Sequence, residues 1–208
     1  MNYYKYPRTY HLPYSLGMTS DDKVLSDDSL FHNKNVVVTI KMDGENTTIC
    51  KNKVYARSID SKHEWYHSWL MNYASSRQIH INQNERICGE YLYCKHSIKY
   101  TNLPSYFMGF SFWKDTRCLH WDETVDLFSI LDIHPVYVIY RGIYNREVIE
   151  KSFHNVVKSG EEGIVVRNVE SFEYDDFSKN VAKCVRKNHV QTDTHWKNSK
   201  IEQNDLYF

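Results

Sequence analysis

The sequence predicts an α+β fold in which mainly antiparallel sheets are flanked by helices. Short stretches rich in β-branched and aromatic residues recur along the chain, and three segments with helical character interrupt them. The two kinds of segment do not alternate regularly, as they would in a protein built from βαβ units. The 208 residues, without a repeat or an obvious linker, fit one domain over residues 1–208.

The first half of the chain predicts a strand-rich start after an irregular lead-in. Asp-Gly at residues 43–44 and Lys-Asn at residues 51–52 predict tight turns, so the strands on either side are expected to form hairpins. These strands are predicted over residues 36–42, 47–50 and 53–57. Residues 63–78 then carry Trp65, Trp69, Leu70 and Tyr73 at spacings of three and four, which predicts an amphipathic helix.

The second half predicts two helices and five further strands. A helix over residues 122–130 is expected to begin at Asp122 as its N-cap and to bury a stripe of Val125, Leu127, Phe128, Ile130 and Leu131. A helix over residues 145–159 is expected to end before Gly160, since glycine is favoured just beyond a helix C-terminus. The strands are predicted over residues 86–93, 105–113, 133–140, 163–169 and 181–186.

Composition narrows the class of protein. No apolar run approaches the roughly 18 residues of a membrane span, and the N-terminus lacks a secretory signal, so a soluble, cytoplasmic protein without a membrane partner is expected. Five cysteines without a Cys-x-x-Cys spacing argue against a disulfide framework and a structural zinc site. His63 and His67 lie four residues apart on a predicted helix and are read as surface residues in preference to a metal pair.

The charge distribution is more informative than the net charge. Twenty-six basic residues balance twenty-six acidic ones, which gives no sign of a nucleic-acid partner. Between Lys179 and Lys200, however, six basic residues stand against the single acid Asp193. An aromatic content of 15% suits base stacking as well as core packing, and composition leaves that choice open.

The stretch Lys41-Met-Asp-Gly-Glu-Asn, at the end of a β-branched strand, is the first candidate for chemistry. Alone it is equally a surface lysine beside a common turn. Three later charges, Glu90, Glu162 and Lys183, lie in or beside apolar strands. Glu and Lys are rarely buried unless paired, so each of these is either on a water-facing edge strand or in a cleft. Together they favour a cleft lined by acids and lysines.

A series of motifs resembles those of the covalent nucleotidyltransferases, and the RNA ligase branch most of all. The resemblance implies the ATP-grasp-like adenylation domain of DNA and RNA ligases. The lead-in that starts at Tyr6 and the tail His189-Val-Gln-Thr-Asp are also similar to short ATP-dependent RNA ligases of bacteria and phages. In order, the motifs are Lys41-Met-Asp-Gly-Glu-Asn, Arg57, Gly89-Glu90, Phe110-Ser-Phe-Trp, Glu162-Gly-Ile-Val-Val-Arg167 and Lys183-Cys-Val-Arg186.

The resemblance implies an ATP-dependent RNA ligase that works in three steps with Mg²⁺ or Mn²⁺. Lys41 attacks the α-phosphate of ATP, pyrophosphate leaves, and AMP stays on the lysine as a phosphoramidate. AMP then passes to an RNA 5′-phosphate, and a 3′-hydroxyl attacks that phosphate, joins the strands and releases AMP. Lysine has a free pKa of about 10.4, so metal and ATP are expected to activate Lys41, which should be mostly protonated in the empty enzyme.

The motif positions also imply a role for each side chain. Arg57 and Glu90 would hold the ribose, and Phe110 would stack on adenine, unless it is an ordinary core residue. Glu162, together with Glu90, would bind the metal. The other implied roles are nucleotide contact by Ile40, orientation of the nucleophile's turn by Asp43, α-phosphate contact by Asn46 and Lys183, and contact with the outgoing phosphates by Arg167.

Two departures from the family pattern affect these expectations. Phage-type ligases have Lys-x-Lys where this chain has Lys183-Cys-Val, and the next cation, Arg186, would point to the opposite face of a regular strand. Either a bulge turns Arg186 inward to bind nucleotide, or Lys183 acts without a companion. Only 22 residues follow Arg186, so no C-terminal oligonucleotide-binding domain is expected. The catalytic domain, the basic segment or a helper protein would then hold the RNA.

Other activities are compatible with the same residues. DNA ligation and GTP-dependent capping use a related active site, although the absence of an oligonucleotide-binding domain speaks against both. An RNA-end-binding module without catalysis is the alternative from a different class. Which nucleotide labels Lys41, and whether any does, would separate these alternatives.

Overall fold

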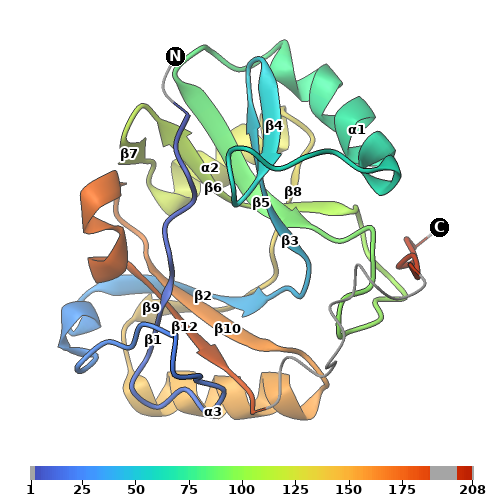
Figure 1. Cartoon of the computed structure of the whole chain (residues 1–208). Helices are drawn as coiled ribbons and strands as arrows, with labels where there is room; N and C mark the ends of the chain where they lie inside the picture. Colours follow the sequence, from blue (N-terminus) through green and yellow to red (C-terminus); the bar gives the residue numbers. More distant parts are fainter. Residues whose placement is uncertain (1–2, 188–200, 208) are drawn as a thin grey trace.

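Two β-sheets and the helices packed on them make up the fold (Figure 1). The computed structural model describes residues 3–187 and 201–207. Sheet A has the order β1-β12-β10-β2-β9, and all of its pairs are antiparallel except the parallel pair β1 and β12. Its strands are β1 (Tyr10–His11), β12 (Val181–Val185), β10 (Gly163–Asn168), β2 (Asn35–Lys41) and β9 (Val138–Ile143).

Sheet B has the order β11-β7-β6-β5-β3-β4 and is antiparallel along this path. A short extra strand, β8 (His134–Pro135), pairs in parallel with β6. The strands on the path are β11 (Phe172–Glu173), β7 (Arg117–Cys118), β6 (Phe107–Lys114), β5 (Glu85–Tyr91), β3 (Glu45–Cys50) and β4 (Lys53–Ala56).

Three α-helices cover these sheets. The helix α3 (Arg146–Lys158) packs against β9 and β10 of sheet A, and Figure 1 shows it along the outer side of that sheet. The helices α1 (Ser68–Gln78) and α2 (Trp121–Ile130) pack on sheet B, α1 against β3 and α2 against β6 and β8. Short 3₁₀ turns complete the described chain: η1 (Ser29–Phe31), η2 (Trp65–His67) and η3 (Tyr174–Lys179). The predicted α+β class with mainly antiparallel sheets is confirmed.

In the described part of the chain, none of the helices is long and apolar enough to span a membrane. The five cysteines are free and buried. The basic segment predicted between Lys179 and Lys200 lies largely outside the described residues, as does the tail from His189.

The predicted hairpin around residues 43–44 is wrong. β2 pairs with β9 and β10, whereas β3 pairs with β4 and β5, so the chain passes from one sheet to the other at Met42–Gly44. Gly44 packs tightly at this crossing, because a Cβ there would lie 2.5 Å from the Tyr91 carbonyl oxygen. An Asp-Gly pair that commonly closes a hairpin therefore serves here to bring two sheets together.

The segment predicted as one strand over residues 133–140 is in fact two. β8 joins sheet B and β9 joins sheet A, with Val136 and Tyr137 between them. This is a second point where the chain crosses between the sheets. A continuous apolar run shows burial but does not show which neighbour each residue pairs with, and the prediction failed for that reason.

The boundaries of two helices also differ from the prediction. Helix α2 begins at Trp121 and is capped by His120, whose side chain accepts a hydrogen bond from the Asp122 amide, so Asp122 lies in the first turn. Ile130 is 77% exposed and does not belong to the buried stripe. Helix α1 begins at Ser68, because the residues from Trp65 form a 3₁₀ turn instead.

Side chains alternate between two hydrophobic clusters along the strands of sheet A. Val36 and Val38 of β2 pack in the cluster beneath α3, and Val37 packs in the larger cluster shared with sheet B. The alternation is the period of two expected for a strand with both faces covered. One face of sheet A therefore looks toward sheet B, and every second residue of each strand points there.

Candidate active site

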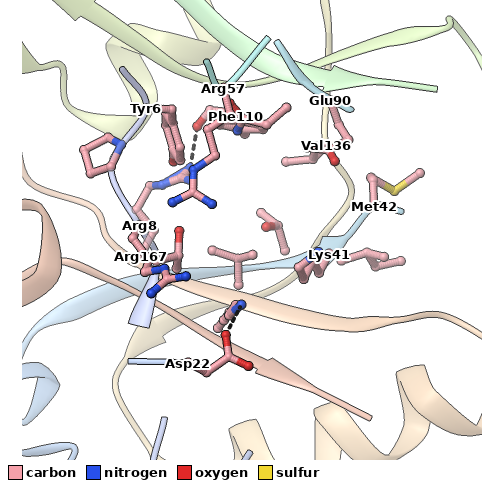
Figure 2. Close-up of a pocket in the computed structure, with 17 residues that line it drawn as sticks. Tyr6, Arg8, Asp22, Lys41, Met42, Arg57, Glu90, Phe110, Val136 and Arg167 are labelled. Atoms are coloured by element: carbon pink, nitrogen blue, oxygen red, sulfur yellow. Dashed lines mark hydrogen bonds and ion pairs between the residues drawn. The ribbon is translucent and has the colours of Figure 1, made fainter. Parts of the chain in front are cut away.

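Strand periodicity places three charged side chains of sheet A on the face toward sheet B. Lys41 is two residues beyond Thr39 on β2, Arg167 is two residues beyond Val165 on β10, and Val165 lies opposite both Thr39 and Lys183 in the sheet. Residues directly opposite one another on neighbouring strands share a face. Lys41, Arg167 and Lys183, far apart in the sequence, therefore point into one space. Figure 2 shows Lys41 and Arg167 in this arrangement.

Sheet B supplies the opposite wall. Asn46 of β3 lies opposite Glu90 of β5, so both side chains are on one face. Phe110 of β6 lies at a register shift, where Gly109 pairs with Gly89 and Ser111 pairs with Cys88. Phe110 is the extra residue of this bulge and has no partner in the register. A bulge beside the cleft thus places an aromatic ring in its wall.

Between the two walls lies a cavity of about 250 Å³. Eight of the predicted nucleotide-binding residues line it, and the lead-in segment at Tyr6–Thr9 closes one side. Figure 2 shows Glu90, Met42 and Lys41 on one side of the cavity and Tyr6, Arg8 and Arg167 on the other. The predicted residues in the lining are Ile40, Lys41, Asn46, Arg57, Glu90, Phe110, Arg167 and Lys183.

Lys41 is held by a carboxylate that does not itself line the cavity. Its Nζ lies 2.5 Å from Oε2 of Glu162, a residue with 5% exposure just before β10. Burial alone lowers the pKa of Lys41, but the carboxylates of Glu162, Glu90 and Asp43 together raise it above its ordinary value. The raised pKa favours the cationic form of Lys41, and protonation of this lysine in the nucleotide-free protein stays a prediction.

Glu90 has the most unusual environment among the acids of the site. Burial, and then the charges of Glu162 and Asp43 against the opposing charge of Lys41, raise the pKa of Glu90 to about 8. One of its oxygens accepts a 3.3 Å hydrogen bond from the Gly44 amide. At neutral pH this carboxyl group is mostly neutral, which makes the cavity more cationic than a count of its acids suggests.

Lys183 has a partner that sequence reasoning did not identify. Its Nζ lies 3.6 Å from Oδ1 of Asp22, and the same oxygen lies 3.2 Å from Nε2 of the buried His11. Burial and the charge of Lys41 lower the pKa of Lys183, and Asp22 opposes this. Burial raises the pKa of Asp22, but hydrogen bonds from Thr19 and the interactions with Lys183 and His11 outweigh it and lower the pKa.

Two further lining residues, Asn46 and Arg167, each have a buried polar atom without a hydrogen-bond partner in the described chain, Oδ1 and Nε respectively. The side-chain oxygen of Asn46 is buried and has no hydrogen-bond partner among residues 3–187 and 201–207, which leaves it able to bond a ligand. Arg167 is 5% exposed, donates to the Phe110 carbonyl, and has its guanidinium carbon 5.6 Å from the ring centres of both Phe110 and Trp121. Arg167 therefore contacts both the backbone and the ring of Phe110.

Besides Glu162, two predicted site residues lie outside the cavity lining. The Asp43 carboxylate accepts hydrogen bonds of 2.7 and 2.8 Å from the amides of Ser97 and Ile98, and so fixes the turn after Lys41 to a neighbouring loop. Arg186 follows the end of β12, whose register with β10 runs without a shift, and its amide donates to the Glu162 carbonyl. The paired part of β12 thus contains no bulge that would turn Arg186 inward.

Sequence reasoning missed several lining residues. Arg8 and Asp22 come from the region assigned as an irregular lead-in, where neither periodicity nor a charged residue in an apolar strand drew attention to them. The familiar lead-in starting at Tyr6 was the one available signal. The remaining missed residues are aromatic, apolar or small and indistinguishable from core residues in the sequence: Tyr6, Pro7, Thr9, Thr39, Met42, Val136 and Val165.

The donor set near Lys41 fits a hard divalent cation. Glu162, Glu90 and Asp43 bring carboxylate oxygens near Lys41. Burial is the main cause of the raised pKa of Glu90, and the charges of Glu162 and Asp43 add a repulsion that a cation would relieve. No cluster of three or more potential ligands is formed by side chains alone in the described chain, so waters or substrate phosphates would complete the coordination. His67 bonds Glu45 at 2.8 Å and the Glu64 amide, as a structural residue does.

Comparison with solved structures finds the same fold in RNA ligases. An archaeal ATP-dependent RNA ligase is 15% identical with a TM-score of 0.57, over 85% of this chain and 48% of that one. A substituted Naegleria gruberi RNA ligase with ATP and Mn is 16% identical with a TM-score of 0.59, over 79% of this chain and 53% of that one. This chain thus spans about half the length of these proteins, and at such identities the likeness shows the fold.

The sequence itself gives the family. No curated protein sequence matches the chain significantly. The profile of the RNA ligase family, however, matches residues 34–185, from the start of β2 to the end of β12, and this range holds Lys41, Glu90, Glu162 and Lys183. With most of its length matched by this profile, the chain belongs to the RNA ligase family.

Proposed function

We propose that the chain is an ATP-dependent RNA ligase that forms a lysyl-AMP intermediate on Lys41. The observation that carries this proposal is the meeting of Lys41, Glu162, Glu90 and Lys183, from both sheets, around one cavity. Membership of the RNA ligase family supports it, as do the relatives solved with ATP and Mn. Because the chain spans about half of those relatives, its own activity and substrates are part of the proposal.

The cavity suits a nucleotide. Phe110 on sheet B and Val165 on sheet A face it from opposite walls, and Ile40 and Val136 extend its apolar lining, so a flat base can lie between them. Arg57 and Glu90 would hold the ribose. The Asn46 amide, with its unpartnered oxygen, and the Lys183 ammonium would then contact the α-phosphate.

In the first step Lys41 would act as nucleophile. Nζ forms a bond to the α-phosphorus while the bond from that phosphorus to the bridging oxygen breaks, and pyrophosphate leaves with the electron pair. Before the attack Nζ must release a proton to solvent water, and the Glu162 carboxylate opposes this loss in the empty site. A bound Mg²⁺ or Mn²⁺ would offset the charge of Glu162 and of the phosphates. Lys183 would stabilise the charge that develops on the phosphate oxygens.

The second step would release AMP from Lys41, and the third would follow in the same cavity. The RNA 5′-phosphate attacks the α-phosphorus, the phosphorus–nitrogen bond breaks, and AMP becomes joined to the RNA end. A 3′-hydroxyl then attacks the 5′-phosphate, forms the new phosphodiester and releases AMP. The catalytic domain, the basic residues that follow Lys179 or a helper protein would hold the RNA, and such phosphate contacts make binding salt-dependent.

Intact-mass measurement tests the reaction class directly. The purified protein is incubated with ATP and Mg²⁺, and a covalent AMP adduct that maps to Lys41 is expected. Lys41→Ala should abolish the adduct, whereas Lys151→Ala, which removes an exposed lysine of α3, should leave it unchanged. A protein that gains no adduct, or gains it equally in Lys41→Ala, would refute the proposal and favour an RNA-end-binding module.

Nucleotide and substrate choice separate the related activities. An adduct formed from GTP in place of ATP would indicate capping chemistry instead of ligation. With ATP established, nicked and single-stranded substrates made of RNA or DNA, each with a 5′-phosphate and a 3′-hydroxyl, are offered to the adenylated protein. Sealing of RNA is the expected result, and sealing of DNA alone would contradict the proposed substrate.

A further inference from the structure

We propose that Tyr100 is a positioning residue for Lys41. Tyr100 belongs to the loop over residues 92–106, which joins β5 to β6 and which residues 201–207 hold in place. Its side chain does not line the cavity, so it acts on the reaction through the turn that follows Lys41. The inference rests on the proposed function, in which Lys41 is the nucleophile, and it gives a role in that reaction to a loop that contains none of the motif residues.

The hydroxyl group of Tyr100 connects the two chain segments that carry the ion pair of Lys41 and Glu162. It accepts a 3.0 Å hydrogen bond from the amide of Asp43, two residues beyond Lys41. It donates at 3.5 Å to Oε2 of Glu161, the residue directly before Glu162. A hydroxyl group has a single proton to donate, and here both its donor and an acceptor position are in use.

The Tyr100 side chain is itself fixed by packing. It is 8% exposed and belongs to the larger hydrophobic cluster, together with Met42 of the turn. Close packing of a buried ring leaves it little freedom to move, so its hydroxyl oxygen is a fixed point for the Asp43 amide. Burial raises the pKa of the Tyr100 phenol above its ordinary value, so the hydroxyl keeps its proton and stays a donor at neutral pH.

The same loop also binds the side chain of Asp43. The amides of Ser97 and Ile98 donate to its carboxylate at 2.7 and 2.8 Å, while Tyr100 accepts from its backbone amide. Backbone and side chain of Asp43 are thus bound by neighbouring residues of one loop. The turn after Lys41 therefore cannot shift without the loop, and the position of the loop sets the direction in which the chain leaves β2.

Residues 201–207 lie against the loop and bind the backbone of Tyr100 (Figure 1). The fully buried side chain of Asn204 accepts from the Tyr100 amide at 2.9 Å and donates to the Leu92 carbonyl at 2.8 Å. The Asp205 amide donates to the Tyr100 carbonyl at 2.9 Å, and the Leu103 amide donates to the Asp205 carbonyl at 3.0 Å. Both backbone groups of Tyr100 are therefore bonded to this segment, which holds the loop against the turn.

The rate of a group transfer depends steeply on where the nucleophile lies. A misplacement of about 1 Å can lower a rate about 100-fold. In the proposed reaction Lys41 is the nucleophile of the first step and the leaving group of the second. The third step joins a 3′-hydroxyl to an RNA end that is already activated, and Lys41 forms or breaks no bond in it. A residue that positions Lys41 therefore affects formation of the AMP adduct and leaves the third step unchanged.

The test compares two reactions of the whole chain in Tyr100→Phe, which removes the hydroxyl group and keeps the ring. Formation of the AMP adduct is followed in single turnovers over a range of ATP concentrations with Mg²⁺. Sealing is followed with RNA that already carries AMP on its 5′-phosphate. Hydrogen exchange of the Asp43 amide reports the hydrogen bond itself. Tyr144→Phe is the matched control, because it removes the hydroxyl of another buried tyrosine, which donates to Asp28 at 2.8 Å and lies outside the cavity lining.

Tyr100→Phe is expected to lower the rate constant of adduct formation at saturating ATP about 10- to 100-fold. The ATP concentration that gives half the maximal rate should stay unchanged, because Tyr100 does not line the cavity. Sealing of the adenylated RNA should proceed at the wild-type rate, and the Asp43 amide should exchange faster. Tyr144→Phe should leave both reactions and the Asp43 amide unchanged.

The inference is overturned if Tyr100→Phe forms the adduct as fast as wild type. It is equally overturned if both reactions slow by the same factor, which would indicate a general loss of structure, or if only the half-saturating ATP concentration rises, which would indicate direct contact with the nucleotide. A wild-type protein that forms no adduct refutes the proposed function instead. Exchange of the Asp43 amide then still decides whether Tyr100 holds the turn, so the two failures can be told apart.

Discussion

Replacing Glu90 by glutamine should make the stability of the protein depend less on pH. The pKa of this carboxyl is raised from 4.5 to about 8, chiefly by burial, so the folded state favours its neutral form. The stability that it contributes is fully present below about pH 4.5. It is lost progressively as the pH rises through the interval up to about 8, because the unfolded chain ionises there and the folded one resists.

The size of the effect follows from the same two values. The two pKa values differ by about 3.5 pH units, and each unit corresponds to about 1.4 kcal/mol. The ionisation of Glu90 can therefore change the free energy of unfolding by at most about 5 kcal/mol between low and high pH. Glutamine has the shape of the neutral acid and retains an oxygen for the Gly44 amide, but it does not ionise. The variant should therefore gain stability over wild type as the pH rises from 5 to 8.

Urea denaturation in the presence of EDTA, at unit steps from pH 5 to pH 9, measures this difference. Between pH 5 and pH 8 the stability of Glu90→Gln relative to wild type should rise by up to about 1.4 kcal/mol per pH unit and then level off. Glu147→Gln, at an exposed position in the first turn of α3, should show a difference of a few tenths of a kcal/mol at most. A constant difference for Glu90→Gln across the range would refute the reasoning.

Three further outcomes are expected. Gly44→Ala should lower the free energy of unfolding by about 1–3 kcal/mol and slow AMP adduct formation, because the added Cβ would lie 2.5 Å from the Tyr91 carbonyl oxygen. Wild-type stability in urea together with a wild-type rate of adduct formation would contradict this. Asn204→Ala should lower the free energy of unfolding by about 2–4 kcal/mol and expose the Tyr100 amide to hydrogen exchange. The buried Asn204 side chain accepts a hydrogen bond from that amide at 2.9 Å and donates one to the Leu92 carbonyl at 2.8 Å. Unchanged protection of the Tyr100 amide would count against this prediction. Lys41 should remain an ammonium group at pH 9 in nucleotide-free, metal-free protein, as ¹⁵N NMR of its Nζ can report, and a neutral amine there would contradict the raised pKa.

The sequence determined most of the elements and most of the residues around the cavity. Local patterns were enough for the strands that carry Lys41, Glu90 and Lys183, because alternation, chain breaks and charged residues in apolar strands are all visible in a few neighbouring residues. The motif order, supported by resemblance to a known family, gave eight side chains that line one cavity. The family profile confirms that the resemblance was correct.

Pairing between distant strands decided how the chain passes between the sheets and where the bulge at Phe110 lies. The Asp-Gly turn after Lys41 has the sequence of a hairpin, yet it joins two sheets, because β2 finds its partners in β9 and β10 more than a hundred residues away along the chain. The bulge that turns Phe110 into the cavity depends likewise on the register between β5 and β6. Such long-range choices are fixed by burial of whole sheet faces, to which each local sequence contributes a part.

The lead-in shows the same limit most clearly. Arg8 and Asp22 belong to a stretch with little regular secondary structure, and their neighbours in the sequence give no reason to place them in an active site. The parallel pairing of Tyr10 and His11 with Ala182 and Lys183 brings this stretch against β12 and so into the cavity. Sequence alone indicated which side chains would carry the proposed chemistry, and tertiary structure decided which charges meet, because electrostatic energy depends on distances that only the folded chain sets.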